Sequence, residues 1–198
     1  MFYKQKDMKK NLVAGILLFT ASLAFWGCSD DDDAVQPLTV SIGDTYEGGI
    51  VFYIAEDKLS GLVAAPQDQG SEIVWSAKRK VIPTEKAIGT GLANTIFIVE
   101  VKKGDTEEFA AKAAYDLVLG GYDDWYLPSI DELEELYKQR AIVGLNETGT
   151  YWSSSAIDGG YPNAGYTYNL TVKTGKSQTD MNQHSGYAVR AVRTIKAK

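Results

Sequence analysis

Few residue types in this 198-residue chain could carry out catalysis. It has one His and one Cys, which excludes disulfides, multi-Cys zinc sites and every site that needs two His. Ser153, Ser154 and Ser155 stand together, but no Gly-x-Ser-x-Gly turn surrounds them. His184 lies in a polar stretch with no adjacent carboxylate to orient it. We therefore expect no enzymatic activity, and a hydrolase with an unrecognised site is the weaker alternative.

Residues with hard oxygen ligands are grouped in the last third of the chain. They are Asp158, Asn163, Asn169, Asp180 and Asn182. Calcium needs about 6–8 oxygen atoms, often with converging carboxylates, and no Asp-x-Asp-x-Asp spacing occurs here. Asp and Asn also favour turns. We therefore predict no bound metal and no cofactor.

The same region has the side chains best suited to hold a ligand. Aromatic rings stack on the apolar faces of sugars, and amides offer both donors and acceptors. The predicted ligand-binding residues are Tyr161, Asn163, Tyr166, Tyr168, Asn169, Asp180, Asn182 and His184. The alternative is that Tyr166 and Tyr168, which alternate with polar residues, face the core.

Residues 1–27 have the pattern of an export signal. Four Lys precede the apolar run Leu12–Phe25, which is shorter than the roughly 20 residues of a membrane-spanning helix. Gly27 and Cys28 follow, and the arrangement resembles the lipobox of bacterial lipoproteins. The resemblance implies cleavage before Cys28 and attachment to the outer membrane through acyl chains on Cys28. An uncleaved signal anchor is the alternative.

An acidic run follows the Cys. It consists of Asp30, Asp31, Asp32 and Asp33. The run resembles the export signal of surface lipoproteins of Bacteroidota, which implies exposure at the cell surface, and a plain spacer is the alternative. Residues 28–42 are predicted to form a flexible tether, and residues 43–198 a single domain.

The charge of the chain limits its partners. The whole chain has 20 basic and 26 acidic side chains and a formal net charge of −6. Residues 1–27 contain four Lys and one Asp, so the mature chain keeps 16 basic and 25 acidic side chains and a charge of −9. Nucleic acids and anionic lipid headgroups are therefore unsuitable partners.

The order of strands, then helices, then strands predicts an α+β domain. The predicted strands are Gly49–Ala55, Leu62–Ala65, Ile73–Ser76, Tyr151–Ser155, Gly165–Val172, Lys176–Asp180 and Gly186–Thr194. One helix is predicted to begin at Asp105 or Thr106, and a second at the capping box of Ser129 and Glu132. The segment Asn94–Val101 has strand propensity but lies between Gly-rich turns and a helix, so it is left unassigned.

Four sequence blocks occur in a characteristic order. They are Gly120–Ser129, Glu132-Leu133, Tyr151–Ser155 and Val189–Arg193. With Gly48–Tyr53 and Leu62–Pro66 upstream, they resemble the C-terminal domain of the Legionella collagen-like adhesin. The resemblance implies a C-type-lectin-like fold, with two helices beside a mainly antiparallel sheet, and in that adhesin the binding of sulfated polysaccharide. A net charge of −9 suits such a polymer poorly unless the basic side chains are clustered.

Packing and capping account for most residues of these blocks. The Trp side chains are predicted to lie in the core. Arg190 and Arg193 are predicted to lie on opposite faces of one strand and to pair with carboxylates such as Asp123 or Asp124. Together these patterns predict a surface-tethered, non-catalytic binding module for a glycan or another cell-surface ligand. A structural or adhesive subunit that binds a protein is the alternative.

Overall fold

The computed structural model describes residues 35–76, 82–161, 164–180 and 182–198. They belong to one compact unit, Val35–Lys198. The predictions for Cys28, for the acidic run at 30–33 and for Asn163 lie outside the described residues. In the part of the chain that is described, no helix combines the length and the apolar character needed to cross a bilayer.

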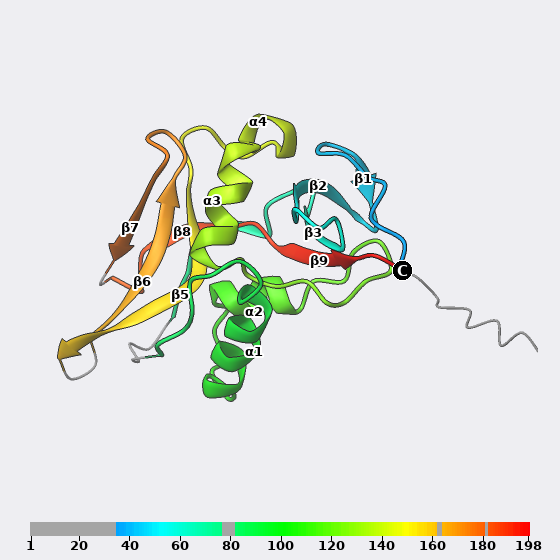
Figure 1. Ribbon diagram of the computed structural model, residues 1–198. Coiled ribbons are helices and arrows are strands. Elements are labelled where there is room, and N and C mark those ends of the chain that lie inside the picture. Colours follow the sequence, from blue (N-terminus) through cyan, green and yellow to red (C-terminus); the bar gives the residue numbers. More distant parts are fainter. Residues whose placement is uncertain (1–34, 77–81, 162–163, 181) are drawn as a thin grey trace, which may run out of the picture. The chain divides into compact units, whose positions relative to one another are not determined.

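The described residues form two sheets (Figure 1). The first has the order β1-β2-β3-β9 and contains β1 (Thr45–Tyr46), β2 (Gly49–Ile54), β3 (Ser60–Ala64) and β9 (Val192–Lys196). The second has the order β4-β8-β5-β6-β7 and contains β4 (Gly70–Val74), β5 (Thr150–Tyr161), β6 (Ala164–Thr171), β7 (Lys176–Asp180) and β8 (Gly186–Val189). All strand pairs are antiparallel except β5 with β8.

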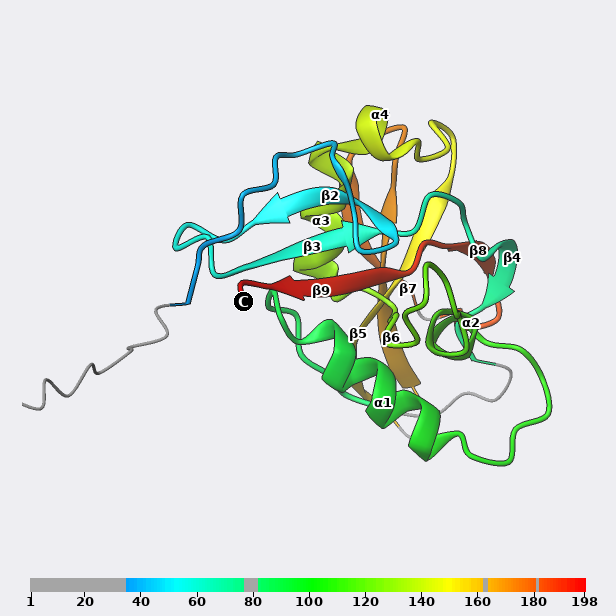
Figure 2. The same ribbon diagram turned by 90° about the vertical axis from the view of Figure 1, so that its right-hand side faces the viewer.

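Four helices lie in the described residues, where the sequence predicted two. They are α1 (Gly91–Val101), α2 (Ala110–Tyr115), α3 (Ile130–Lys138) and α4 (Arg140–Val143). Figures 1 and 2 show α4 at the top of the domain and α1 at its lower side. α3 contacts β2 of the first sheet and β5 and β6 of the second, so it joins the two sheets. The prediction of an α+β fold with mainly antiparallel strands is confirmed.

The start of α3 follows the predicted capping box. The Ser129 hydroxyl accepts a hydrogen bond from the Glu132 backbone N–H at 3.3 Å, and the Glu132 carboxylate accepts one from the Ser129 N–H at 2.8 Å. Both bonds satisfy donors that the first helical turn leaves free. Ile130, Leu133 and Leu136 are buried, which fixes the inner face of the helix.

The unassigned segment Asn94–Val101 is helical and forms most of α1. Asn94 exchanges hydrogen bonds with the backbone of Glu85, at 2.7 and 3.0 Å. Thr95 does the same with the backbone of Leu127, at 3.1 Å in each direction. These contacts with distant residues outweigh the strand propensity of the β-branched side chains.

The predicted first helix is shorter than expected. It covers only Ala110–Tyr115, and its cap position is the extended Phe109 rather than Asp105 or Thr106. The Asp105 N–H donates to the Lys102 carbonyl at 2.9 Å, so Asp105 belongs to the turn that ends α1. An Asp held in that turn cannot cap the next helix.

Residues 35–42 belong to the folded unit, which corrects the prediction of a flexible tether up to residue 42. The Gln36 N–H donates to the Lys198 carbonyl at 2.9 Å, and the Leu38 N–H donates to the Lys58 carbonyl at 2.8 Å. The Leu38 side chain is buried in the core. The domain therefore begins at Val35 rather than at residue 43.

The predicted strand Gly186–Thr194 is divided between the two sheets. Its first part is β8 in the second sheet, and its last part belongs to β9 in the first sheet. Arg190 lies in the crossing between them, outside both strands. Trp125 and Trp152 are fully buried in the core beside this crossing chain, as predicted.

Candidate functional site

The predicted ligand-binding residues of β6 lie on two faces of the sheet. Tyr166 and Tyr168 share one face and are half-buried, so their rings are not sealed inside the domain. The Lys86 ammonium lies 4.3 Å from the centre of the Tyr168 ring, within the range of a cation–π contact. Tyr161 is the last residue of β5. A ligand-binding role for these three Tyr residues stays a prediction.

Asn169 does not lie on an exposed surface, which corrects its prediction as a ligand-binding residue. Its side chain is fully buried, and among the described residues neither its amide oxygen nor its amide nitrogen has a hydrogen-bond partner. Its cross-strand neighbour is the buried Trp152. Alternation along β6 turns Asn169 inward, and a ligand outside the domain cannot reach it.

Asp180, Asn182 and His184 come together in the loop after β7. The Asp180 carboxylate accepts from the Asn182 N–H at 2.7 Å, and the Asn182 amide oxygen accepts from the His184 N–H at 3.3 Å. Asp180 also accepts from the Tyr187 phenol at 3.0 Å. These side chains stabilise a turn, which is a common role of Asp and Asn. Asn182 and His184 are exposed, and their ligand-binding role remains a prediction.

The three adjacent Ser residues of β5 are fully buried. Ser153 donates to the Tyr168 carbonyl at 2.9 Å, and Ser155 donates to the Glu85 carbonyl at 2.7 Å. Ser154 accepts from the Asn94 amide at 3.3 Å. Their hydroxyls therefore hold neighbouring segments together and are closed to a substrate. Across the described ranges, no three His, Cys, Asp or Glu side chains lie close enough to share a metal ion.

A hollow of about 620 Å³ opens where α3 and α4 meet the turn between β6 and β7. We call it the basic hollow. It is lined by Tyr137, Arg140, Ala141, Gly144, Leu145, Glu147, Val172 and Lys173. Tyr137 comes from the last turn of α3, Arg140 from α4, and Lys173 from the β6–β7 turn. Residues more than thirty positions apart thus share one surface depression.

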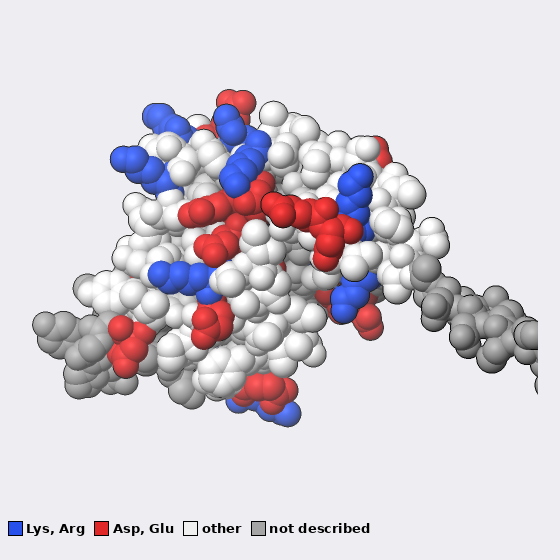
Figure 3. Space-filling model, in the orientation of Figure 1, with Lys and Arg blue, Asp and Glu red and all other residues white. Residues whose placement is uncertain are grey.

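Glu147 also lines the basic hollow, but it forms no ion pair with the cations there in the described part of the chain. Within the described residues, neither Arg140 nor Lys173 has an ion-pair partner. The Arg140 guanidinium lies 4.6 Å from the centre of the Tyr137 ring. Lys176 stands at the start of β7, and Lys138, at the end of α3, pairs with Glu135 at 2.5 Å. Figure 3 shows several basic side chains near the top of the domain, on the side of the β6–β7 turn, with acidic side chains beside and beneath them.

Gly175 brings the β6–β7 turn against Tyr137. Its φ of +65° is a conformation that side chains disfavour, and a Cβ at this position would collide with the Tyr137 phenol. The close approach closes one wall of the basic hollow. The sequence alone does not indicate which residues this turn contacts.

Arg190 is hydrogen-bonded to the Gly144 carbonyl, and Gly144 lines the basic hollow. The Arg190 side chain is only 2% exposed. Its guanidinium donates to the last carbonyls of α4, at 2.8 Å to Val143 and 3.1 Å to Gly144. It also donates to the Ala65 carbonyl at 3.2 Å and to the Asp68 carboxylate at 2.6 Å. One buried cation thus ties α4 to the loop between β3 and β4.

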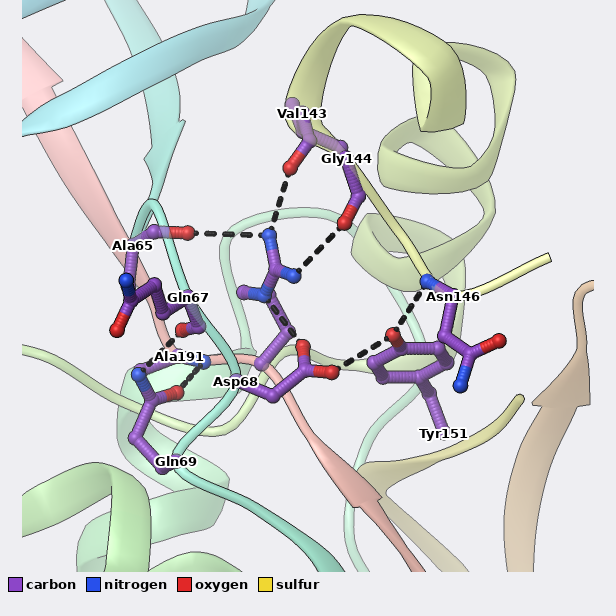
Figure 4. Close-up of polar contacts among 10 residues, drawn as sticks. Ala65, Gln67, Asp68, Gln69, Val143, Gly144, Asn146, Tyr151 and Ala191 are labelled. Atoms are coloured by element: carbon purple, nitrogen blue, oxygen red, sulfur yellow. Dashed lines mark hydrogen bonds and ion pairs between the residues drawn. The ribbon is translucent and has the colours of Figure 1, made fainter. Parts of the chain in front are cut away.

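Tyr151 adds a second link to the same loop. Its phenol donates to the Asp68 carboxylate at 2.9 Å and accepts from the Asn146 N–H at 2.9 Å (Figure 4). Burial raises the pKa of Tyr151 to about 12, so the phenol keeps its proton at neutral pH and remains a donor. Asn146 lies three residues after the end of α4, so both links fix the chain segment that lines the hollow.

The predicted ion-pair partner is confirmed for Arg193 and wrong for Arg190. Arg193 pairs with Asp124 as predicted, and also with Glu47 at 3.0 Å. Arg190 pairs with Asp68 instead of Asp123 or Asp124. The reason is the division of the predicted strand, because the crossing between β8 and β9 turns Arg190 toward the β3–β4 loop.

A larger hollow of about 760 Å³ lies between the β3–β4 loop and α2. Its walls include the carboxylates of Asp68, Glu108 and Asp116. Each already has a cationic partner: Asp68 pairs with Arg190, and the other two contact Lys112. Although this hollow is larger, it offers fewer unpaired charges. The basic hollow is therefore the stronger candidate for a charged ligand.

The chain forms an α+β domain with a basic hollow on its surface. Buried hydrogen bonds of Arg190 and Tyr151 hold the segment that lines this hollow. The family model of the Lcl C-terminal domain matches residues 64–193, about two thirds of the chain. The chain therefore belongs to the Lcl C-terminal domain family, which indicates an adhesin-like surface module. The matched range includes the basic hollow and Arg190, while the block Gly48–Tyr53 lies outside it. Comparison with curated proteins finds no match.

Proposed function

We propose that this protein is a non-catalytic, surface-exposed binding module, tethered to the outer membrane by acyl chains on Cys28. Its ligand is an acidic glycan, which binds in the basic hollow. One observation carries this proposal: Arg140 and Lys173 line the same depression as Tyr137 and have no ion-pair partner within the described residues.

The chemistry of the hollow matches a saccharide that carries carboxylate or sulfate groups. A guanidinium binds such groups through two parallel hydrogen bonds, and an ammonium supplies a point charge. An aromatic ring gives a flat apolar surface on which a sugar ring can stack. Pockets that hold small ligands measure about 300–1,000 Å³, and the basic hollow is about 620 Å³.

The acidic character of the rest of the chain limits the length of that glycan. A mature chain at −9 repels a long polyanion, except where its basic residues gather. Arg140 and Lys173 form such a local group of basic residues in the basic hollow. We therefore propose a site for one or a few acidic sugar units rather than for an extended charged polymer.

The absence of catalysis and the fold type are part of the proposal. The buried Ser hydroxyls of β5 support a non-catalytic role, because a nucleophile must reach its substrate. A C-type-lectin-like arrangement of the α+β fold rests on the family resemblance. The charge of the chain supports the exclusion of nucleic acid as a partner.

A glycan array with the mature protein tests the ligand. Arg140→Ala and Lys173→Ala should each weaken binding of acidic glycans roughly tenfold, the equivalent of one charge-assisted contact. The control is Lys103→Ala, which removes an exposed positive charge at the end of α1. Binding that survives both substitutions would move the site to Tyr166 and Tyr168. An array with no bound glycan would favour a protein partner.

The anchor is tested separately by cell fractionation. Cys28→Ala should leave the protein unprocessed or released, because Cys28 is the only thiol that can be acylated. A membrane-bound product of normal size would contradict the anchor. Replacement of residues 30–33 by Ala should preserve lipidation but reduce protease accessibility on intact cells. Unchanged accessibility would make the acidic run a spacer.

A further inference from the structure

α1 exposes several apolar residues on one side, while two polar residues and Ile98 are buried on the other. Asn94 and Thr95 are 4% and 0% exposed, whereas Ile96 and Phe97 are 44% and 48% exposed. Leu92, at 36%, lies one turn before Ile96 on the same side. The helix thus has an apolar exposed side in addition to the side on which Ile98 is buried in the core.

The exposed stripe continues beyond the start of the helix. Ile88 is 39% exposed and precedes Leu92 by four residues. We call Ile88, Leu92, Ile96 and Phe97 the α1 face. Between Ile88 and Val101 the only charged residue is Glu100, which pairs with Lys103 at 3.7 Å. Figure 3 shows a largely uncharged surface over α1.

Folding does not require the apolar character of the α1 face. The polar side chains of Asn94 and Thr95 already attach the helix to the core through four hydrogen bonds with Glu85 and Leu127. The outward positions could therefore be polar at no cost to that attachment. Contiguous exposed apolar side chains mark interaction surfaces, so the α1 face needs an apolar partner.

The length of the tether identifies that partner. The folded unit begins at Val35, seven residues after Cys28. At most about 3.6 Å per residue, seven residues span no more than about 25 Å. A folded unit of this size has a radius of gyration of about 15 Å. An acylated Cys28 therefore keeps the domain within about 25 Å of the bilayer, close enough for one of its faces to rest there.

We infer that the α1 face rests on the lipid bilayer, with Leu92, Ile96 and Phe97 inserted at the boundary between headgroups and acyl chains. The inference rests on the lipid anchor of the proposed function. Apolar faces of interfacial helices enter such a boundary by about 5–10 Å. The lipids in contact are zwitterionic, because a mature chain at −9 is repelled by anionic headgroups. α4 and the basic hollow then point away from the membrane (Figures 1 and 2).

Tryptophan fluorescence of the lipidated protein in phosphatidylcholine vesicles tests this placement. Phe97→Trp puts an indole on the α1 face, and Ile142→Trp puts one at a 49% exposed position of α4 as the matched control. The native Trp75, Trp125 and Trp152 are buried and give the same background in both variants. In vesicles with brominated acyl chains, the emission added at position 97 should be mostly lost, while that added at position 142 should persist.

Each other outcome overturns the inference in a distinguishable way. Protein that floats with the vesicles but shows equal emission at both positions is anchored without contact of the α1 face. Protein that does not float has no lipid anchor, which overturns the proposed attachment and the placement together. A blue shift at position 97 that follows protein concentration rather than lipid would assign the α1 face to a second copy of the chain.

Discussion

Arg190 and Asp68 lie 122 residues apart in the chain and form an ion pair of 2.6 Å. The pair fastens the crossing between the two sheets to the β3–β4 loop. The remaining N–H groups of Arg190 hold the end of α4, so the geometry of the basic hollow depends on a contact outside it.

Asp68→Asn should destabilise the domain by about 3 kcal/mol, at the lower end of the range for removing one partner of a buried pair. The substitution keeps the shape of the side chain but leaves the Arg190 charge uncompensated. Chemical denaturation measures the change in the free energy of unfolding. Asp123→Asn is the control, because Asp123 is exposed. Equal stability of both variants would show that the pair contributes little.

Stability should rise on mild acidification because of Glu132. Burial raises the pKa of this carboxyl above its ordinary 4.5, although its carboxylate accepts hydrogen bonds from the Ser129 and Gly89 N–H groups. The folded state therefore binds the proton more tightly than the unfolded state. The stabilising contribution is complete below pH 4.5 and is lost as the pH rises through the raised pKa.

Glu132→Gln isolates this effect. The variant keeps the size of the side chain but cannot titrate, so its unfolding free energy should change less between pH 7 and pH 4.5 than that of the wild type. Denaturant titrations at a series of pH values give the comparison. A pH dependence identical to that of the wild type would assign the slope to another group.

Trp125→Ala should cost roughly 3–5 kcal/mol, the range for emptying a large aromatic site in a core. Trp125 is fully buried, and its indole N–H donates to the Leu119 carbonyl at 3.3 Å. Tyr115→Ala, at a 43% exposed position of α2, serves as the aromatic control and should change stability by about 0.5 kcal/mol. Similar melting temperatures of the two variants would contradict the core role of Trp125.

Gly175→Ala should weaken glycan binding, whereas its loss of stability should match that of a control glycine variant. The new Cβ would push Tyr137 out of the wall of the basic hollow. Gly121→Ala tests the backbone effect alone, since Gly121 also has a positive φ, of +84°, but a Cβ there meets no neighbouring atom. Both variants should lose about 1–2 kcal/mol of stability from the left-handed conformation. Only Gly175→Ala should lower the affinity for acidic glycans on the array. Equal glycan affinities of the two variants would show that Tyr137 does not contribute to binding.

Local sequence patterns predicted the elements whose causes are local. The capping box of Ser129 and Glu132 marked the start of α3, and the strand Lys176–Asp180 has the predicted bounds. α1 could not be assigned in this way. Its helical state depends on hydrogen bonds from Asn94 and Thr95 to segments that are remote in the sequence.

The basic hollow also could not be predicted from local sequence patterns, because tertiary contacts assemble it. Arg140 and Lys173 are separated by 33 residues, and only the approach of the β6–β7 turn to α3 brings them together. One signal in the sequence could have indicated them: basic side chains at the ends of elements in an acidic chain. Asn169 shows the opposite error, because its polar side chain looked suited to a surface but is fully buried.

The hydrogen bond from the Gln36 N–H to the Lys198 carbonyl has a topological consequence. It places Gln36 beside Lys198, so the two ends of the described unit are adjacent in space. Such a unit can be inserted into a loop of a larger polypeptide without stretching its host, and it tolerates circular permutation. A peptide linker from Lys198 back to Val35 would need only a few residues, and new ends could then be opened at an exposed turn such as the one between β6 and β7.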